Sequence, residues 1–447
     1  MNVHFIAIGG STMHNLAIAL HLKGYNVSGS DDEIFEPAKS RLQKYGILPD
    51  SVGWFPEKIT SQLDAIILGM HARIDNPELV KAKELGIKIY SFPEFLYEQS
   101  QNKKRIVIGG SHGKTSITSM ILHVFNEQNL SFDYMVGAQL EGFEVMVKLS
   151  EDAPIIVLEG DEYLTSPIDR RPKFLLYKPD IAVISGIAWD HFNVFPTFEV
   201  YKEQFLKFAN LVPDDGVLIY CDLDENVLEV AYKSTCPMKI PYGLPIFEIH
   251  ENRTFIKYDG KKYPLSVFGN HNLMNIEAAR NVCRLVGISD HDFYSSISNF
   301  GGASKRMEKI MEKADMVAFK DFAHSPSKVQ ATIEAVKQQY PDKELVALFE
   351  LHTYSSLNAD FLEQYRGAMD CANVPMVYFD HHALAIKKLP MLEPEVIQEK
   401  FNNPKILVIN DKNNIIEYFI KVDKRNKVFL FMSSGNFGGI DLVGLLK

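Results

Sequence analysis

Residues 106–116 read Ile-Val-Ile-Gly-Gly-Ser-His-Gly-Lys-Thr-Ser. An apolar run typical of a buried strand leads into a glycine-rich turn, and a helical pattern rich in Ile, Met and Leu follows. In this order the glycines let backbone N–H groups close around phosphate oxygens, and the helix directs its positive end at them. Lys114 can reach the outer phosphates, and the Thr115 hydroxyl can ligate Mg²⁺. The pattern therefore predicts a site for a nucleoside triphosphate.

The turn departs from the strict phosphate-loop pattern at one position. That pattern has glycine five residues before Gly113, where this chain has Ile108, so a shorter G-x-x-G-K-[ST] form remains. A glycine-rich turn with a chance Lys-Thr pair is the alternative, but the flanking strand and helix favour the nucleotide. The candidate nucleotide-binding residues of the turn are Gly110, Ser111, His112, Gly113, Lys114, Thr115 and Ser116.

Two more apolar runs end in side chains that suit a metal ion. Residues 154–158 end in Glu159, and residues 181–184 lead to His191. Open α/β sheets bind ligands at the carboxyl ends of their strands. Taken singly, these residues could be a solvated acidic loop and a structural histidine. Beside a phosphate-binding turn, they favour one cation held by Glu159 opposite Thr115 and a second held by His191.

The flanking sequence continues the alternation of strands and helices. Residues 3–8 resemble a buried strand before a helix at 13–22, and β-rich runs recur towards the C-terminus. Such alternation predicts an α/β fold with largely parallel sheets covered on both faces. Residues 245–268 alternate apolar and polar residues around Asp259-Gly260, which predicts a β-hairpin. A polar segment at 99–104 and Gly301-Gly302 separate three such units.

The bulk composition excludes several classes of protein. The 447 residues are 46% hydrophobic and 23% charged, with a net charge of −10, so a nucleic-acid partner is not expected. No apolar run approaches the ~20 residues that span a bilayer, so we expect no membrane insertion. Four separated cysteines without a C-x-x-C pair and the absence of a leader pattern fit a cytoplasmic protein.

Six motifs occur in the order and approximate spacing of the muramyl (Mur) ligase family, and this resemblance covers essentially the whole chain. They are residues 110–115 (GSHGKT), Glu159, residues 190–191 (DH), 269–275 (GNHNLMN), 305–308 (KRME) and 321–326 (DFAHSP). The resemblance implies an ATP-dependent ligase that forms an amide bond through an acyl phosphate. It also implies three domains: a Rossmann-like UDP-sugar domain at 1–102, a central P-loop ATPase-type domain with a parallel or mixed sheet at 103–302, and a Rossmann-like C-terminal domain at 303–447.

The resemblance also implies roles for individual residues. It places ATP near His271, Asn272, Asn275, Arg306 and Asp321, with the first three at the adenine, Arg306 on the phosphates and Asp321 near the ribose. It assigns Mg²⁺ to Thr115, Glu159 and His191. His324 would lie near the reacting centre or the incoming amine. The implied catalytic set is Lys114, His191, Arg306 and His324.

The start of the chain resembles the branch of this family whose acyl donor is UDP-N-acetylmuramate. The implied UDP-sugar contacts are Gly9, Gly10, Ser11, Thr12, Met13, Ser30 and Asp31. The acceptor in that branch is either L-alanine or the tripeptide L-alanyl-γ-D-glutamyl-meso-diaminopimelate. Residues 159–163 (EGDEY), 169–174 (DRRPKF) and 432–440 (MSSGNFGGI) favour the tripeptide.

Residues 349–356 (FELHTYSS) bear on the acceptor. They resemble the F-x-P-H-x-[YF]-[ST]-R segment of the alanine-adding members, but Ser356 stands where those have arginine. Arginine clamps a carboxylate with two hydrogen bonds, and serine cannot replace it in that role. His352 and Tyr354 remain candidate acceptor contacts together with His324. L-alanine as the acceptor, and a non-catalytic nucleotide-binding regulator, stay open as alternatives.

Overall fold

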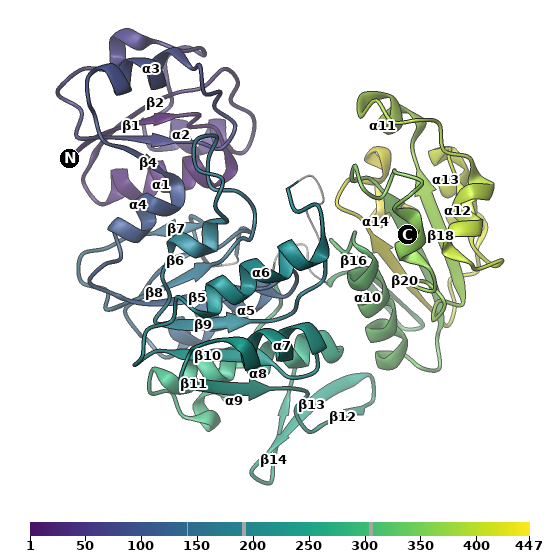
Figure 1. Cartoon of the computed structure of the whole chain (residues 1–447). Coiled ribbons are helices and arrows are strands. Elements are labelled where there is room, and N and C mark those ends of the chain that lie inside the picture. The colour runs from purple at the N-terminus through teal and green to yellow at the C-terminus, as the bar shows by residue number, and fades with distance from the viewer. Residues whose placement is uncertain (141, 190–193, 304–306) are drawn as a thin grey trace. The chain divides into compact units, whose positions relative to one another are not determined.

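The computed structural model describes residues 1–140, 142–189, 194–303 and 307–447. These residues form two compact units, one of residues 1–243 with 274–297 and the other of residues 244–273 with 298–447. Each unit consists of α/β sheets with helices around them (Figure 1). Among the described helices, none is both long and apolar enough to cross a bilayer.

The first unit begins with a four-stranded parallel sheet of order β2-β1-β3-β4. Its strands and helices are β1 (Asn2–Ile6), α1 (Ser11–Leu22), β2 (Asn26–Ser30), α2 (Ala38–Lys44), β3 (Ala65–Leu68), α3 (Pro77–Glu84), β4 (Ile89–Ser91) and α4 (Phe92–Glu98). The strand predicted at residues 3–8 ends two residues early. Ala7 has a φ of 69°, and the N–H groups of Ala7 and Ile8 both donate to the Ser30 carbonyl. This turn redirects the chain into α1.

The second sheet of this unit has seven strands in the order β11-β10-β9-β5-β8-β6-β7. Only the short β7 runs antiparallel to its neighbour, so the sheet is mixed. Its elements are β5 (Lys104–Gly109), α5 (Lys114–Glu127), β6 (Asp133–Met135), β7 (Val147–Lys148), β8 (Ile155–Glu159), β9 (Ile181–Ile184), α6 (Phe198–Ala209), β10 (Val217–Cys221), α7 (Glu225–Lys233), β11 (Met238–Tyr242), α8 (Asn270–Leu285) and α9 (Asp290–Ile297). Because β5 lies between β8 and β9, the segments that follow these three strands emerge together at one sheet edge.

A three-stranded antiparallel sheet, the hairpin sheet, belongs to the second unit. It comprises β12 (Phe247–His250), β13 (Arg253–Tyr258) and β14 (Lys261–Pro264). The predicted hairpin is therefore present, with its turn at Asp259 and Gly260, and one further strand extends it. Both turn residues have positive φ, as a tight two-residue turn requires. Thr254 donates a buried 2.8 Å hydrogen bond to Gln339, which attaches this sheet to the helix α10 (Pro326–Gln339).

The second unit also holds a six-stranded sheet of order β15-β16-β20-β17-β18-β19, in which only β15 is antiparallel. Its elements are β15 (Glu308–Lys313), β16 (Met316–Asp321), α10 (Pro326–Gln339), β17 (Glu344–Leu351), β18 (Val374–Phe379), α11 (His381–Ile386), α12 (Pro394–Phe401), β19 (Leu407–Ile409), α13 (Lys412–Lys421), β20 (Lys427–Met432) and α14 (Leu442–Leu446). Buried apolar clusters cover both faces of the sheet. The predicted α/β fold class is confirmed. The sheets of four, seven and six strands, each with its helices, correspond to the three predicted parts.

The described residues also form four short 3-10 helices: η1 (Pro56–Lys58), η2 (Lys173–Leu176), η3 (Leu362–Tyr365) and η4 (Phe437–Gly439). The boundaries predicted at residues 102 and 302 stay predictions. Residues 244–273, which the sequence assigns to the central domain, belong to the same compact unit as the C-terminal sheet.

Candidate active site

The predicted phosphate-binding turn connects β5 to α5, and its glycines fill positions where a side chain would not fit. Gly110 and Gly113 have φ values of 140° and 79°. A Cβ atom at Gly110 would lie 2.1 Å from the Ser185 hydroxyl oxygen, and one at Gly113 would lie 2.6 Å from Oδ1 of Asn275. No described side chain caps the first turn of α5. Its N-terminus therefore has the geometry of an anion site.

The Lys114 ammonium is held by two acceptors at this turn. It donates to the Gly110 carbonyl at 2.6 Å and to Oε2 of Glu162 at 2.5 Å, and the Tyr201 hydroxyl donates to Oε1 of Glu162 at 3.0 Å. Burial lowers the pKa of Lys114, but the negative charges of Glu162 and Asp161 outweigh it and hold the pKa above its usual range. Lys114 is therefore a cation at neutral pH.

Glu159, at the end of β8, lies beside the turn as predicted. Oε1 accepts a hydrogen bond from the Thr115 hydroxyl at 2.9 Å, and Oε2 accepts from the Gly137 N–H at 2.7 Å. Burial raises the pKa of Glu159, against the opposing effects of Gly137 and Lys114. A hydroxyl and a carboxylate oxygen this close are both within reach of one Mg²⁺, which prefers such oxygen ligands.

The segment after β9 packs against the same turn. The Ser111 N–H and hydroxyl both donate to the Gly186 carbonyl, at 2.9 and 3.1 Å. A Cβ atom at Gly186 would lie 2.1 Å from the His112 ring, so glycine is needed here. The chain then runs towards His191. This predicted metal ligand lies outside the described residues, as does Arg306, the predicted phosphate ligand.

Helix α8 carries the residues predicted to contact adenine. Asn275 approaches Gly113 of the turn, as described above. One turn earlier, Asn272 donates from Nδ2 to the Phe268 carbonyl at 2.9 Å, and His271 follows the helix start. The structure brings Asn275 to the nucleotide turn, whereas an adenine role for the three residues remains a prediction.

In the second unit, Asp321 is the last residue of β16, and His324 follows in the turn after it. Both carboxylate oxygens of Asp321 accept backbone hydrogen bonds, from Met307 at 2.6 Å and from Ala323 at 2.7 Å. The His324 carbonyl accepts a 2.5 Å hydrogen bond from the Tyr365 hydroxyl. Asp321 therefore shapes the turn that carries His324.

A second buried carboxylate lies two strands away in the same sheet. Glu350 on β17 is 4% exposed, and its Oε2 accepts from the Ser433 hydroxyl and the Phe437 N–H. A Cβ atom at Gly435 would lie 2.7 Å from Nδ1 of His352, so residues 433–437 lie directly against Glu350 and His352. These groups stand at the carboxyl ends of β17 and β20, where open sheets bind ligands.

Ser356, at the position of the arginine clamp, is buried and bonded within its own turn. It is 1% exposed, and its hydroxyl accepts from Thr353 at 2.9 Å and donates to the Thr353 carbonyl at 3.2 Å. The neighbouring Tyr354 is 61% exposed. Ser356 therefore serves to close a tight turn.

The predicted sugar-binding residues surround the start of α1 in the first unit. Gly10 occupies the N-cap, and no described side chain caps the helix. The Gly9 N–H donates to Asp31 at 2.7 Å, and burial is the main cause that raises the pKa of Asp31 to about 6. Met13, by contrast, is 4% exposed and packs beneath the turn. An open helix N-terminus with adjacent backbone amides suits a diphosphate.

Comparisons with known proteins show the family to which the chain belongs. Three family models match successive parts of the chain: "Mur ligase family, catalytic domain" at residues 2–104, "Mur ligase middle domain" at 108–283 and "Mur ligase, glutamate ligase domain" at 305–435. The UDP-N-acetylmuramate--L-alanine ligase of Clostridium kluyveri is 30% identical over 450 residues, which cover 97% of this chain and 95% of that protein. The chain belongs to the Mur ligase family. It is an ATP-dependent ligase that forms amide bonds in peptidoglycan precursors.

Solved structures show the same fold for this Mur ligase. The UDP-N-acetylmuramate-alanine ligase of Thermotoga maritima has a TM-score of 0.70 at 20% identity, covering 98% of this chain and 97% of that one. The murein peptide ligase of Psychrobacter arcticus has a TM-score of 0.64 at 22% identity, covering 100% and 98%. Alanine-adding and peptide-adding enzymes thus share this architecture.

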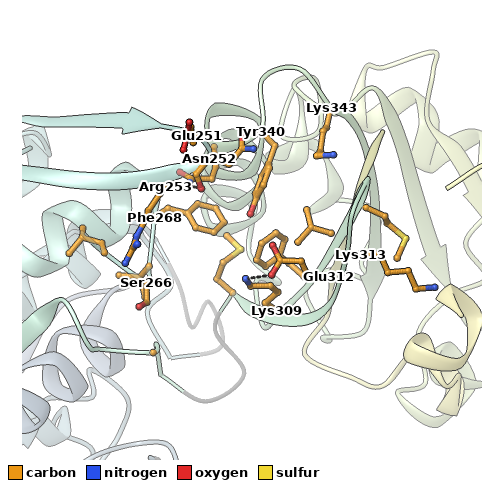
Figure 2. A pocket seen from close by; sticks show the side chains of 18 of the residues that line it. Glu251, Asn252, Arg253, Ser266, Phe268, Lys309, Glu312, Lys313, Tyr340 and Lys343 are labelled. Carbon is orange, nitrogen blue, oxygen red and sulfur yellow. Dashed lines mark hydrogen bonds and ion pairs between the residues drawn. The ribbon is translucent and has the colours of Figure 1, made fainter. Parts of the chain in front are cut away.

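The second unit of the ligase also contains a cavity of 520 Å³. It opens between the hairpin sheet and β15 and β16, and Figure 2 shows Phe268 and Tyr340 on its wall beside the Lys309–Glu312 ion pair. Lys343, also at the cavity, donates to the Asp315 carbonyl. Within the part of the chain that the structure describes, its lining includes none of the residues that the sequence assigns to ATP, so we do not place the nucleotide there.

Three of the residues described above, two in the first unit and one in the second, received no role from the sequence. Glu162 lies in the EGDEY run. This run indicates a charged segment at the end of a strand, but nothing in it indicates that Glu162 pairs with Lys114. Tyr201 lies 39 residues further on, in α6, and no local pattern connects it to that run. Glu350 occupies a position inside the apolar β17, where a buried carboxylate is itself an unusual signal.

Proposed function

We propose that this Mur ligase joins the lactyl carboxylate of UDP-N-acetylmuramate to the amine of L-alanyl-γ-D-glutamyl-meso-diaminopimelate. The names of its relatives support the donor, because both the alanine-adding ligases and the solved peptide-adding ligases belong to the branch that uses this sugar nucleotide. The uncapped start of α1, with Gly9 and Asp31 beside it, is the proposed diphosphate site.

The observation that carries the proposed acceptor is the burial of Ser356. Free L-alanine has a carboxylate next to its reacting amine, and an arginine at this position would hold that carboxylate. Here the serine hydroxyl is bonded to Thr353 within its own turn. Glu350 and residues 433–437 instead line the sheet edge with a buried carboxylate and a glycine-rich loop. A carboxylate there suits the extra ammonium group of meso-diaminopimelate.

We further propose that ATP and Mg²⁺ occupy the turn at residues 110–116. The described residues fit Mg²⁺, since Thr115 and Glu159 offer two adjacent oxygens and the remaining ligands of this ion are usually phosphates and water. No group of three or more His, Cys, Asp or Glu is placed to hold a metal within the described residues. When bound, the ion would offset charge on the phosphoryl oxygens.

The proposed chemistry proceeds in two steps. A carboxylate oxygen of the donor attacks the γ-phosphorus of ATP, and the bond from this phosphorus to the β-phosphate oxygen breaks. ADP departs, and the donor is now an acyl phosphate. The neutral amine then attacks the acyl carbon, phosphate leaves, and the amine loses a proton. Lys114 and Arg306 would offset the charge that moves onto the phosphates. His324 would lie beside the incoming amine, and His191 would hold the second cation.

L-alanine remains the second candidate acceptor, because the curated relatives at 28–30% identity are alanine-adding ligases. Parallel assays of phosphate release with L-alanine and with the tripeptide distinguish the two, and the proposal expects at least a tenfold higher kcat/KM for the tripeptide. A higher value with L-alanine would refute the proposed acceptor. Release with neither acceptor would favour a nucleotide-binding regulator.

Lys114→Ala tests the division of labour between the sites. We expect this variant to lose ligation while UDP-N-acetylmuramate still binds with the affinity of the unmodified protein, as measured by calorimetry. Equal loss of both activities would contradict separate sugar and nucleotide sites.

A further inference from the structure

Glu162 and Tyr201 form a support behind the phosphate-binding lysine. We propose that Glu162, held in place by Tyr201, is a positioning residue that presents the Lys114 ammonium to the phosphates during phosphoryl transfer. The inference rests on the proposed role of Lys114 in ATP binding and adds to it the residues that fix the lysine.

The contacts leave the lysine little freedom. A lysine side chain is flexible and has many rotamers, so an unsupported ammonium occupies many positions. Here the Gly110 carbonyl and Glu162 take two of its three N–H donors, at 2.6 and 2.5 Å. At most one donor remains for a phosphate oxygen, and its direction is set by these two acceptors.

The support comes from three separate elements. Glu162 follows β8 and its side chain is 1% exposed, Tyr201 lies in α6 and is fully buried, and Lys114 begins α5. The Tyr201 hydroxyl fixes one carboxylate oxygen and leaves the other directed at the lysine. A carboxylate whose second oxygen is held by a hydrogen bond is a rigid acceptor, and a rigid acceptor is needed to hold a cation in one position.

An ordinary buried ion pair that only stabilises the fold is the competing explanation. The adjacent Asp161 supplies the comparison, because it pairs with Lys173 at 2.6 Å on the same loop. Asp161 adds to the negative charge around Lys114, but its direct partner is Lys173, whereas the direct partner of Glu162 is the lysine of the phosphate-binding turn. In protein kinases a lysine–glutamate pair from two elements likewise has to form before the lysine can serve the phosphates.

The test compares Glu162→Gln with Asp161→Asn, since both remove one carboxylate charge from the loop after β8. We expect Glu162→Gln to lower kcat at least tenfold while the KM for ATP and the Kd for ADP change less than threefold. In this variant the Lys114 ammonium would be misplaced, and its charge matters most in the transition state, when the phosphoryl bond breaks. Asp161→Asn should lower the thermal midpoint and keep kcat within threefold. Tyr201→Phe, which retains the ring, should lower kcat about three- to tenfold without changing the midpoint as much as Asp161→Asn.

The proposal is overturned if Glu162→Gln keeps kcat within threefold, or if Asp161→Asn and Glu162→Gln lower kcat equally. Should Glu162→Gln fail to fold, an unchanged kcat in a folded Tyr201→Phe overturns it instead. These outcomes require an active unmodified protein. Failure of the proposed function is therefore separate, since it would show as no amide formed by the unmodified protein with either acceptor.

Discussion

Lys103→Met tests the buried ion pair that fixes the start of β5. The Lys103 and Asp133 side chains are 5% and 0% exposed and lie 3.1 Å apart. Lys103 also donates to the carbonyls of Ser150 and Ala153, at 3.0 and 2.8 Å. Methionine keeps most of the apolar stem but leaves the Asp133 charge without its cation. Breaking a buried pair from one side costs about 3–5 kcal/mol, so we expect a loss of that size in the free energy of unfolding.

The assay is urea unfolding followed by circular dichroism, with thermal scans beside it. At about 2–4 °C per kcal/mol, the midpoint should fall by on the order of 10 °C. Lys104→Met is the matched control, because Lys104 is exposed and such changes stay within about 0.5 kcal/mol. Adding Asp133→Asn to Lys103→Met should recover part of the loss, since it removes the uncompensated charge. Equal stability of Lys103→Met and Lys104→Met would refute the reasoning.

Two further predictions concern the loops of the site. Gly113→Ala should weaken ADP binding at least tenfold, because its Cβ would meet Asn275 at 2.6 Å. Gly142→Ala is the control, since Gly142 has the same φ of 79° but lies in open space, and it should leave ADP affinity unchanged. Equal effects of the two variants would assign the loss to backbone strain alone. The pKa of Asp161 is lowered to about 2, since the charges of Lys173 and the phosphate-binding lysine outweigh the raising effect of burial. Its ionised form therefore stabilises the fold above pH 3.8, and this contribution is lost as the pH falls through 2. Asp161→Asn should lower the urea midpoint at pH 6 but not near pH 2, and an equal deficit at both values would contradict this.

Local chemistry was enough to predict that Thr115 and Glu159 lie side by side. The approach of Thr115 to Glu159 follows from parallel-strand logic, because the strands before them are neighbours and their carboxyl ends share an edge. The Tyr201–Glu162 contact did not follow from the sequence, because it depends on how α6 packs over the sheet. The early end of β1 was also missed, since nothing in the sequence marks Ala7 for a positive φ.

The bond between Thr254 and Gln339 has a practical meaning for dissecting the enzyme. A fragment that starts at residue 303 would contain α10 but not the hairpin sheet, so Gln339 would lose its buried partner. The ring of Phe319 would lose Phe268, which packs 5.4 Å from it. Such a fragment should aggregate, and one that carries residues 244–273 alongside it should remain in solution. The domain boundary predicted from the sequence, at residue 303, therefore differs from the boundary of the fragment that we expect to fold.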